Sequence, residues 1–289
     1  MEKLSTIGRP VDPGYRSNLL IILLSVASFL GFGLLSYFAG ESPLGSLVAG
    51  ARSFISVFLV WALGREIDPD HHLTAVMAAI GQVVILTLIG AQGLLFLFWA
   101  LLAFRVLNRT TGLPAGLADT IFLTALSLWL SYSLSGVIAG AGAAIFLADA
   151  TMSESNKKHF IPGTLLAGAA AYFWLSGDFW WPGFENYPVK LGLIISISLV
   201  FFLAIHNNRN LSSTGDQTGE PLSSLRVQLT QFIALGIGIL YPLWTGVAGF
   251  HLSASFWAVL GATALVNAAI SLGLGSTVSS IETGLAGTG

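Results

Sequence analysis

Ten apolar segments recur along the chain, and short polar stretches separate them. A helix needs about 20 apolar residues to cross the ~30 Å hydrocarbon core of a bilayer, and most of the segments approach or exceed that length. We place them at 18–39, 44–63, 72–89, 92–107, 115–133, 135–150, 160–176, 190–206, 226–245 and 253–273. The pattern predicts an all-α polytopic integral membrane protein with about ten transmembrane helices.

Two pairs of segments are nearly continuous, and the distribution of basic residues indicates whether each pair is one span or two. Residues 72–107 and 115–150 each exceed one span, and each contains a turn-like stretch, at 90–93 and 131–136. When both are divided and the N-terminus is inside, Lys190 alone falls outside, as the positive-inside bias favours. The basic residues inside are then Lys3, Arg9, Arg16, Arg65, Arg105, Arg109, Lys157, Lys158, Arg209 and Arg226. We therefore expect both termini in the cytoplasm and the protein in the cell (plasma) membrane.

Composition supports a lipid environment. Hydrophobic residues make up 54% of the 289 and charged residues only 9%, whereas a soluble domain carries about 25% charged residues. The formal net charge of −2 gives no reason to expect a nucleic-acid partner, so the expected partners are the lipid bilayer and a small-molecule solute. The chain has no cysteine, which excludes disulfides and thiolate chemistry.

We expect three regions: a cytoplasmic N-terminal segment at 1–17, a single transmembrane helical domain at 18–273 and a disordered C-terminal tail at 274–289. A loop at 207–226, rich in Ser, Thr, Gly and Asn, is predicted to be flexible and cytoplasmic. Ten spans also allow an inverted repeat of five plus five helices. Small residues at every fourth position predict close helix packing, inside the chain or in a homo- or hetero-oligomer; they are Gly136, Gly140 and Ala144.

The second apolar segment carries one charged residue, Arg52. It lies about eight residues in, roughly 12 Å below the near surface at a rise of ~1.5 Å per residue. A charge at that depth costs at least ~2.5 kcal/mol, and no carboxylate is predicted at the same depth. The carboxylate or phosphate of a solute could supply the counter-charge, because both fit the planar guanidinium. Alternatively, Arg52 bonds to helix-end carbonyls or reaches Asp119.

Few other polar side chains are predicted near mid-membrane. Ser56 lies one turn after Arg52 on the same face, and Trp129 could stack on a guanidinium or a ligand. Gln82 and Asn267 lie on other segments, where either an interhelical hydrogen bond or a ligand contact is expected. Asp119, about a turn inside the membrane, is a candidate for proton coupling.

A second polar cluster lies just after the same segment, on the predicted cytoplasmic side. Three carboxylates and two imidazoles fall within seven residues, and such ligands could hold Mg²⁺, Mn²⁺ or Zn²⁺ against a phosphate. They are Glu66, Asp68, Asp70, His71 and His72. The alternative to a metal site is a structural turn, because adjacent histidines point in different directions on a helix.

The size, the ten spans, the inside termini and a proline that precedes an arginine in the second span together resemble the drug/metabolite transporter superfamily. The resemblance covers the architecture and residues 43–52, and it implies a secondary transporter. A proline within the fourth segment and a Gly-Glu at its end, which that family leads us to expect, are absent.

We predict a transporter or permease for a small anionic solute that binds at Arg52, with no catalytic residue and no cofactor. One alternative is a transferase that acts on lipid-linked or phosphate-bearing substrates at residues 66–72, with Mg²⁺ or Mn²⁺. The other is a non-catalytic membrane subunit.

Overall fold

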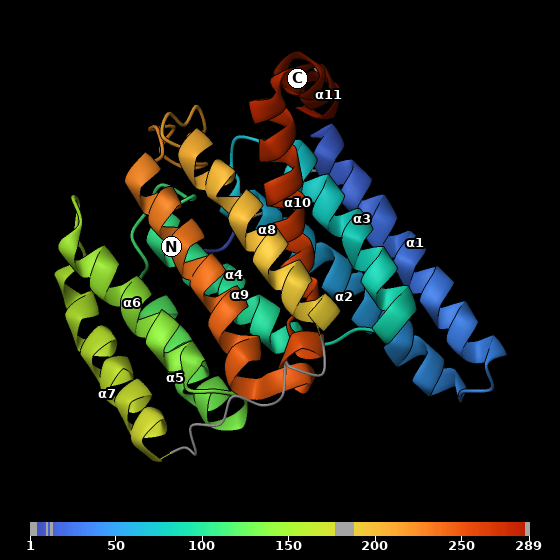
Figure 1. The fold of residues 1–289 in the computed structure, drawn as a ribbon, viewed down its shortest axis with the longest axis horizontal. Coiled ribbons are helices and arrows are strands. Elements are labelled where there is room, and N and C mark those ends of the chain that lie inside the picture. The colour runs from blue at the N-terminus through green and yellow to red at the C-terminus, as the bar shows by residue number, and fades with distance from the viewer. Residues whose placement is uncertain (1–4, 10, 12–13, 177–187, 287–289) are drawn as a thin grey trace. The chain divides into compact units, whose positions relative to one another are not determined.

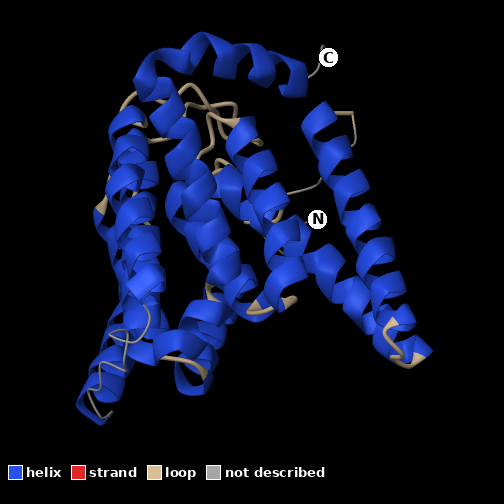
Figure 2. Cartoon of the chain, turned by 45° about the vertical axis from the view of Figure 1, so that its right-hand side comes forward, coloured by secondary structure: helices blue, strands red, loops and turns tan. Residues whose placement is uncertain are grey.

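The computed structural model describes residues 5–9, 11, 14–176 and 188–286, and helices dominate these residues (Figure 1). Each of the ten predicted apolar segments contains a helix, and both nearly continuous pairs are divided. The helices are α1 (Arg16–Phe38), α2 (Pro43–Ile67), α3 (His72–Ile89), α4 (Leu94–Asn108), α5 (Leu117–Ser133), α6 (Val137–Thr151), α7 (Phe160–Ser176), α8 (Pro188–Asn207), α9 (Ser224–Leu252), α10 (Ala254–Ala269) and α11 (Gly275–Ala286). A 3₁₀ turn, η1 (Lys157–His159), precedes α7, and a π-helical turn, η3 (Ile270–Leu274), joins α10 to α11. The described residues form no strand, only one isolated bridge between Thr214 and Pro221 (Figure 2).

Six of the described helical segments are long and apolar enough to cross a membrane. They are α1, α2, α3, α8, α9 and the run from α10 through most of α11. The helices α4, α5 and α6 are apolar but have 15, 17 and 15 residues, fewer than the ~20 that one span needs. The chain is therefore an all-helical membrane protein by length and composition, and the predicted count of about ten spans is not confirmed.

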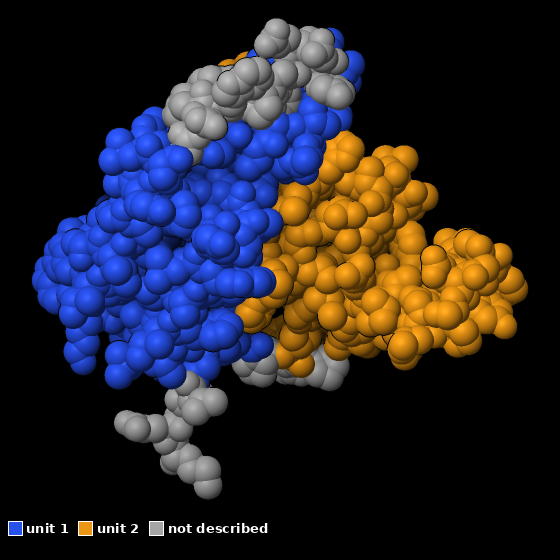
Figure 3. Space-filling model, turned by 90° about the horizontal axis from the view of Figure 1, so that it is seen from below, with its two compact units in different colours: residues 1–9, 99–198, 205–250 blue, residues 10–98, 199–204, 251–289 orange. Residues whose placement is uncertain are grey.

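The chain divides into two compact units, which Figure 3 colours separately. Unit 1 comprises residues 1–9, 99–198 and 205–250, and unit 2 comprises residues 10–98, 199–204 and 251–289. Unit 2 therefore joins α1, α2 and α3 to α10 and α11 from the far end of the chain. The predicted five-plus-five repeat corresponds to neither unit and stays a prediction.

Close approach of α1 and α2 organises one side of unit 2. A Cβ added to Gly50 would lie 2.6 Å from the carbonyl oxygen of Phe29, and one added to Gly33 would lie 3.3 Å from that of Ser46. The α2–α3 contact is equally tight, since a Cβ at Gly64 would lie 2.7 Å from the Cα of Ala75. Glycine at these positions lets the backbones approach and fixes the register of the three helices.

In unit 1, the small-residue face of α6 packs within the chain. A Cβ at Gly136 would lie 2.6 Å from the Cβ of Phe173 on α7, and one at Gly142 would lie 3.0 Å from Leu166 on the same helix. In the same contact, a Cβ at Gly163 of α7 would lie 2.8 Å from the side chain of Leu147. These glycines therefore serve the internal α6–α7 contact; an oligomer through glycine-rich faces stays a prediction.

The C-terminal region differs from the disordered tail predicted for 274–289. Gly273 adopts φ +91°, a left-handed conformation that glycine tolerates, and the chain turns there into α11. Within unit 2, this helix contacts α1, α3 and α10, and it lies near the C label in Figure 2. Its Glu282 accepts hydrogen bonds from the backbone amides of His72 (2.9 Å) and Leu73 (2.7 Å) at the start of α3. The sequence of α11 has few large apolar residues, so its tertiary contact with α3 was not visible in the hydrophobic pattern.

The predicted flexible loop at 207–226 makes contacts within unit 1. The backbone amides of Asp216 and Gln217 donate to the carbonyls of Thr110 and Thr111, each at 3.1 Å. Arg9 Nη2 donates to Asp216 at 2.8 Å. Helix α9 begins just after this loop and is interrupted at Gly246, which adopts φ +72° four residues after Pro242.

Candidate functional site: an arginine-lined groove and two buried carboxylates

Arg52 is exposed on α2 and lines an open groove in unit 2. The start of α2 is fixed by Pro43 in its first turn and by Ser42, whose Oγ accepts from the amide of Gly45 at 3.1 Å. The groove has a volume of about 470 Å³. Its lining comes from α1, α2 and the end of α3 with the following turn: Phe32, Leu35, Ser36, Ala39, Ala49, Arg52, Ser53, Leu86, Gly90, Ala91 and Gln92.

Within the described part of the chain, the guanidinium of Arg52 makes no hydrogen bond or ion pair. Two buried carboxylates are engaged elsewhere: Asp68 pairs with His71, and Asp149 pairs with two other arginines. Asp119, the alternative partner weighed from the sequence, accepts from the amide of Thr6 at 2.8 Å and from its hydroxyl at 3.0 Å in unit 1. The positive charge in the groove is therefore left without an anionic partner among the described residues.

Ser56 and Gln82 lie together in the interior beside the groove. Gln82 Nε2 donates to Ser56 Oγ at 3.2 Å, and Ser56 Oγ donates to the carbonyl of Ser53 at 3.1 Å. Both side chains are fully buried, and Ser53 lines the groove. Gln82 Oε1 has no hydrogen-bond partner among the described residues. This chain of polar groups leads from the α2–α3 contact to the groove that holds Arg52.

The other two predicted ligands of the solute, Asn267 and Trp129, are not among the residues that line the groove. Asn267 Nδ2 donates to Asp68 Oδ2 at 2.9 Å and to the carbonyl of Thr263 at 3.0 Å. Asp68 follows Arg52 by sixteen residues, about 24 Å along α2, so Asn267 is not brought to Arg52. Trp129 lies on α5 in unit 1 and is 52% exposed. Its contact with a solute stays a prediction.

In the polar cluster at residues 66–72, Asp68 is the centre of a hydrogen-bond network. Asp68 is fully buried, and Oδ1 pairs with His71 Nδ1 at 2.8 Å while Oδ2 accepts from Thr74 at 2.7 Å and from Asn267. No group of three or more His, Asp or Glu side chains is placed to hold a metal ion in the residues that the structure describes. The alternative set of Asp68, Asp70, His71 and His72 is thus not gathered around one point.

Burial of the His71 ring opposes its charged form, but the hydrogen bond and negative charge of Asp68 and the charges of Glu282 and Asp70 outweigh it. The pKa of His71 is therefore raised above 6.5.

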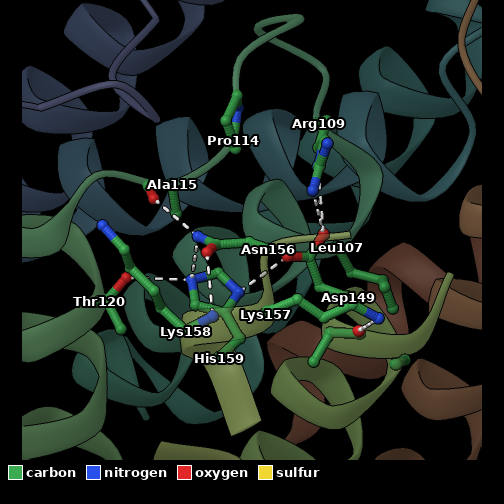
Figure 4. Close-up of polar contacts among 12 residues, drawn as sticks. Leu107, Arg109, Pro114, Ala115, Thr120, Asp149, Asn156, Lys157, Lys158 and His159 are labelled. Carbon is green, nitrogen blue, oxygen red and sulfur yellow. Dashed lines mark hydrogen bonds and ion pairs between the residues drawn. The ribbon is translucent and has the colours of Figure 1, made fainter. Parts of the chain in front are cut away.

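A second buried carboxylate, Asp149, organises one end of unit 1 (Figure 4). Its Oδ1 accepts from Arg226 Nη1 at 2.6 Å and from Arg109 Nε at 3.1 Å, and its Oδ2 lies 2.8 Å from His159 Nδ1. Arg226 also donates to the carbonyls of Leu107 (3.0 Å) and Ser153 (2.9 Å). The group joins the ends of α4 and α6, η1 and the start of α9.

The backbone at Arg109 is strained to reach this carboxylate. Arg109 follows α4 with φ +55°, a left-handed conformation that non-glycine residues rarely adopt. Such a residue costs of order 1 kcal/mol or more, and it persists where the surrounding structure holds it. Here the amide of Arg109 still donates to Arg105 and its side chain binds Asp149, which holds the turn.

Two polar side chains lie against the other ring nitrogen of His159. Asn156 Nδ2 and Thr120 Oγ1 are each 3.1 Å from Nε2. Asn156 Oδ1 accepts from the amide of Lys158 at 3.3 Å, and the Thr120 hydroxyl donates to the carbonyl of Gly116 at 2.8 Å. Both nitrogens of this buried ring therefore lie within hydrogen-bond distance of polar side chains.

Sequence reasoning missed this cluster. Its members are spread over residues 109 to 226, and each one alone resembles an ordinary loop or helix-end charge. Only the tertiary fold brings the four side chains together. A weak signal was available, because Asp149 falls at the end of an apolar segment where a carboxylate needs a partner.

No family model matches the chain, and neither a curated protein nor a solved structure is significantly similar to it.

Proposed function

We propose that this protein is a multi-pass membrane transporter or permease for a small anionic solute, which binds in the groove at Arg52. The observation that carries the proposal is the exposed guanidinium of Arg52, which lines a groove of about 470 Å³ without an anionic partner among the described residues. Small-molecule sites have volumes of roughly 300–1,000 Å³, so the groove is large enough for a solute.

The charge of Arg52 gives the groove its selectivity. In a low-dielectric surrounding, an unpaired guanidinium costs several kcal/mol, and an anion that forms two parallel hydrogen bonds with it removes most of that cost. A cation would be repelled by the same charge. Ser53 and the buried pair of Ser56 and Gln82 supply polarity on one side of the groove.

In this proposal the protein lies in the cell membrane with both termini in the cytoplasm, as the distribution of basic residues favours. The solute site then lies on the outer half of α2, and the helices that surround it move to expose the site to each side in turn.

The direct test is uptake of radiolabelled small carboxylates and inorganic phosphate into proteoliposomes. We expect Arg52→Gln to abolish uptake and Arg52→Lys to retain part of it, because lysine keeps the charge but loses the bidentate geometry. Lys158→Gln is the matched control, since Lys158 is an exposed basic residue outside the groove. Equal uptake by the wild type and Arg52→Gln would refute the proposal.

A further inference from the structure

The groove at Arg52 is charged at one point and apolar over most of its wall. Among the described residues that line it, Arg52 alone is charged. The hydroxyl of Ser53 already donates to the carbonyl of Ala49 at 2.9 Å, and an amide N–H of Gln92 donates to Ile89 at 3.3 Å. Besides the hydroxyl of Ser36 and the second amide N–H of Gln92, the side-chain donors of the groove are those of the Arg52 guanidinium, which alone carry a charge.

The single positive charge of Arg52 can be neutralised by a ligand with a single negative charge. A small dianion or trianion in this groove would leave at least one charge desolvated and unpaired, which is costly in a low-dielectric surrounding. A carboxylate or a singly charged phosphate diester can be bound by the fork of Arg52 through two of its oxygens. The anionic group that suits the groove is therefore monovalent.

The remaining wall of the groove requires an apolar partner. Phe32, Leu35 and Leu86 present large hydrophobic side chains, and three alanines complete the surface. A volume of about 470 Å³ exceeds what a carboxylate or phosphate group occupies by itself. A solute that filled this space with polar atoms would lose hydration without gaining hydrogen bonds from these walls, whereas an apolar body gains free energy from the contact.

The neighbouring helix gives such a molecule an approach from the lipid. Helix α1 forms one wall of the groove, and only 17% of its most apolar stretch is buried. Leu34, Leu35 and Phe38 are 55%, 64% and 80% exposed along it. In a bilayer these side chains contact acyl chains, so the groove opens beside a surface that lipid-like molecules already cover.

We propose, building on the transport function above, that the solute is an amphiphile: one monovalent anionic headgroup that binds Arg52 and one apolar chain that lies along Phe32, Leu35 and Leu86. It enters the groove from the bilayer. The headgroup provides specificity through the guanidinium, and the chain provides affinity through the apolar wall.

The test is a chain-length series of straight-chain carboxylates, from acetate through octanoate to dodecanoate, on the full-length protein in nanodiscs of zwitterionic lipid. Binding is measured by displacement of a fluorescent fatty acid, and protein-free nanodiscs correct for partitioning into lipid. We expect affinity to rise about two- to fourfold per methylene, the range that partial to full burial of a methylene gives. Dodecanol, which lacks the charge, should bind at least tenfold more weakly than dodecanoate.

Two variants separate the headgroup from the chain. Arg52→Gln should reduce dodecanoate binding by at least tenfold, and Lys158→Gln should leave it unchanged. Ala39→Trp places a large side chain in the exposed part of the groove and should weaken dodecanoate far more than acetate. It also gives a second readout should Arg52→Gln fold poorly, which size-exclusion chromatography would reveal.

Other outcomes refute the inference and identify what remains. If acetate or inorganic phosphate binds as tightly as dodecanoate and this binding depends on Arg52, the solute is a water-soluble anion; the transport proposal then stands and the amphiphile is rejected. If dodecanoate and dodecanol bind equally and Arg52→Gln changes neither, the groove binds lipid chains without recognising a charge. If none of the probes shows binding that depends on Arg52, both proposals fail.

Discussion

Glu282 and Leu73 are 209 residues apart in the chain, yet the carboxylate of Glu282 accepts the backbone N–H of Leu73 at 2.7 Å. The same carboxylate accepts the amide of His72, so two free N–H groups at the start of α3 are satisfied by a side chain of α11. An acidic group at this position also faces the positive end of the α3 helix dipole.

We predict that Glu282→Ala releases α11 from α3. Loss of a side-chain cap costs about 0.5–2 kcal/mol. Among the described residues, the other contacts that hold α11 include one buried side chain, Val278, and one long hydrogen bond, from Arg16 Nη1 to the carbonyl of Gly284 at 3.5 Å. Hydrogen exchange at the amides of His72 and Leu73 should accelerate, and proteases should cut within 275–286. Thr283→Ala is the control, because Thr283 bonds only within α11 to Ser279. Unchanged exchange in Glu282→Ala would show that the contact contributes nothing.

The carboxylate of Asp149 should be the most sensitive single position of unit 1. Asp149→Ala leaves Arg109 and Arg226 buried without their shared anion, and breaking a buried ion pair in this way costs about 3–5 kcal/mol. The free energy of unfolding can be measured by SDS titration of the purified protein. Glu154→Gln is the matched control: Glu154 is exposed and 3.9 Å from Arg109, so its loss should change stability by less than about 1 kcal/mol. Comparable effects of the two variants would contradict the arrangement.

The contact that builds one wall of the groove depends on Gly50. Gly50→Ala should destabilise unit 2 by about 1–3 kcal/mol, because the new Cβ would lie 2.6 Å from the carbonyl oxygen of Phe29 and the helices would have to separate. Gly31→Ala on α1 serves as the comparison, since a Cβ there meets nothing within 4 Å. In a helix, that change should be neutral or slightly stabilising. Thermal unfolding followed by tryptophan fluorescence would distinguish them.

His71 should make stability depend on pH. Its pKa is raised above 6.5 in the folded protein, so the protonated ring stabilises the folded state fully below pH 6.5, and this contribution is lost as pH rises through the raised pKa. The melting temperature of the wild type should therefore exceed that of His71→Gln by the largest margin at about pH 5.5, and the margin should shrink toward pH 8. Asp68, Asp70 and Glu282 act on His71, and His72 is its neighbour in the chain; all four are present in both proteins, so the comparison isolates His71. A margin that grows with pH would contradict the raised pKa.

The sequence predicted the positions of the helices because apolar runs are local signals. It also predicted that Arg52 would lack a carboxylate at its depth, since acidic residues are rare in the apolar segments. The sequence could not predict that Asn267 lies beside Asp68, because the register of one helix against its neighbours depends on tertiary packing. The Asp149 cluster and α11 were missed for the same reason, because their contacts join segments that are far apart in the chain.

Unit 2 is assembled from segments that are far apart in the sequence, and this has a consequence for biogenesis. While the ribosome is still making α4 to α9, Asp68 has no amide from Asn267 and the start of α3 has no carboxylate from Glu282. The first three helices must therefore wait in the membrane without these contacts until residues 251–286 have been synthesised. A nascent chain stalled before residue 251 should consequently not yet have the Arg52 groove in its final conformation.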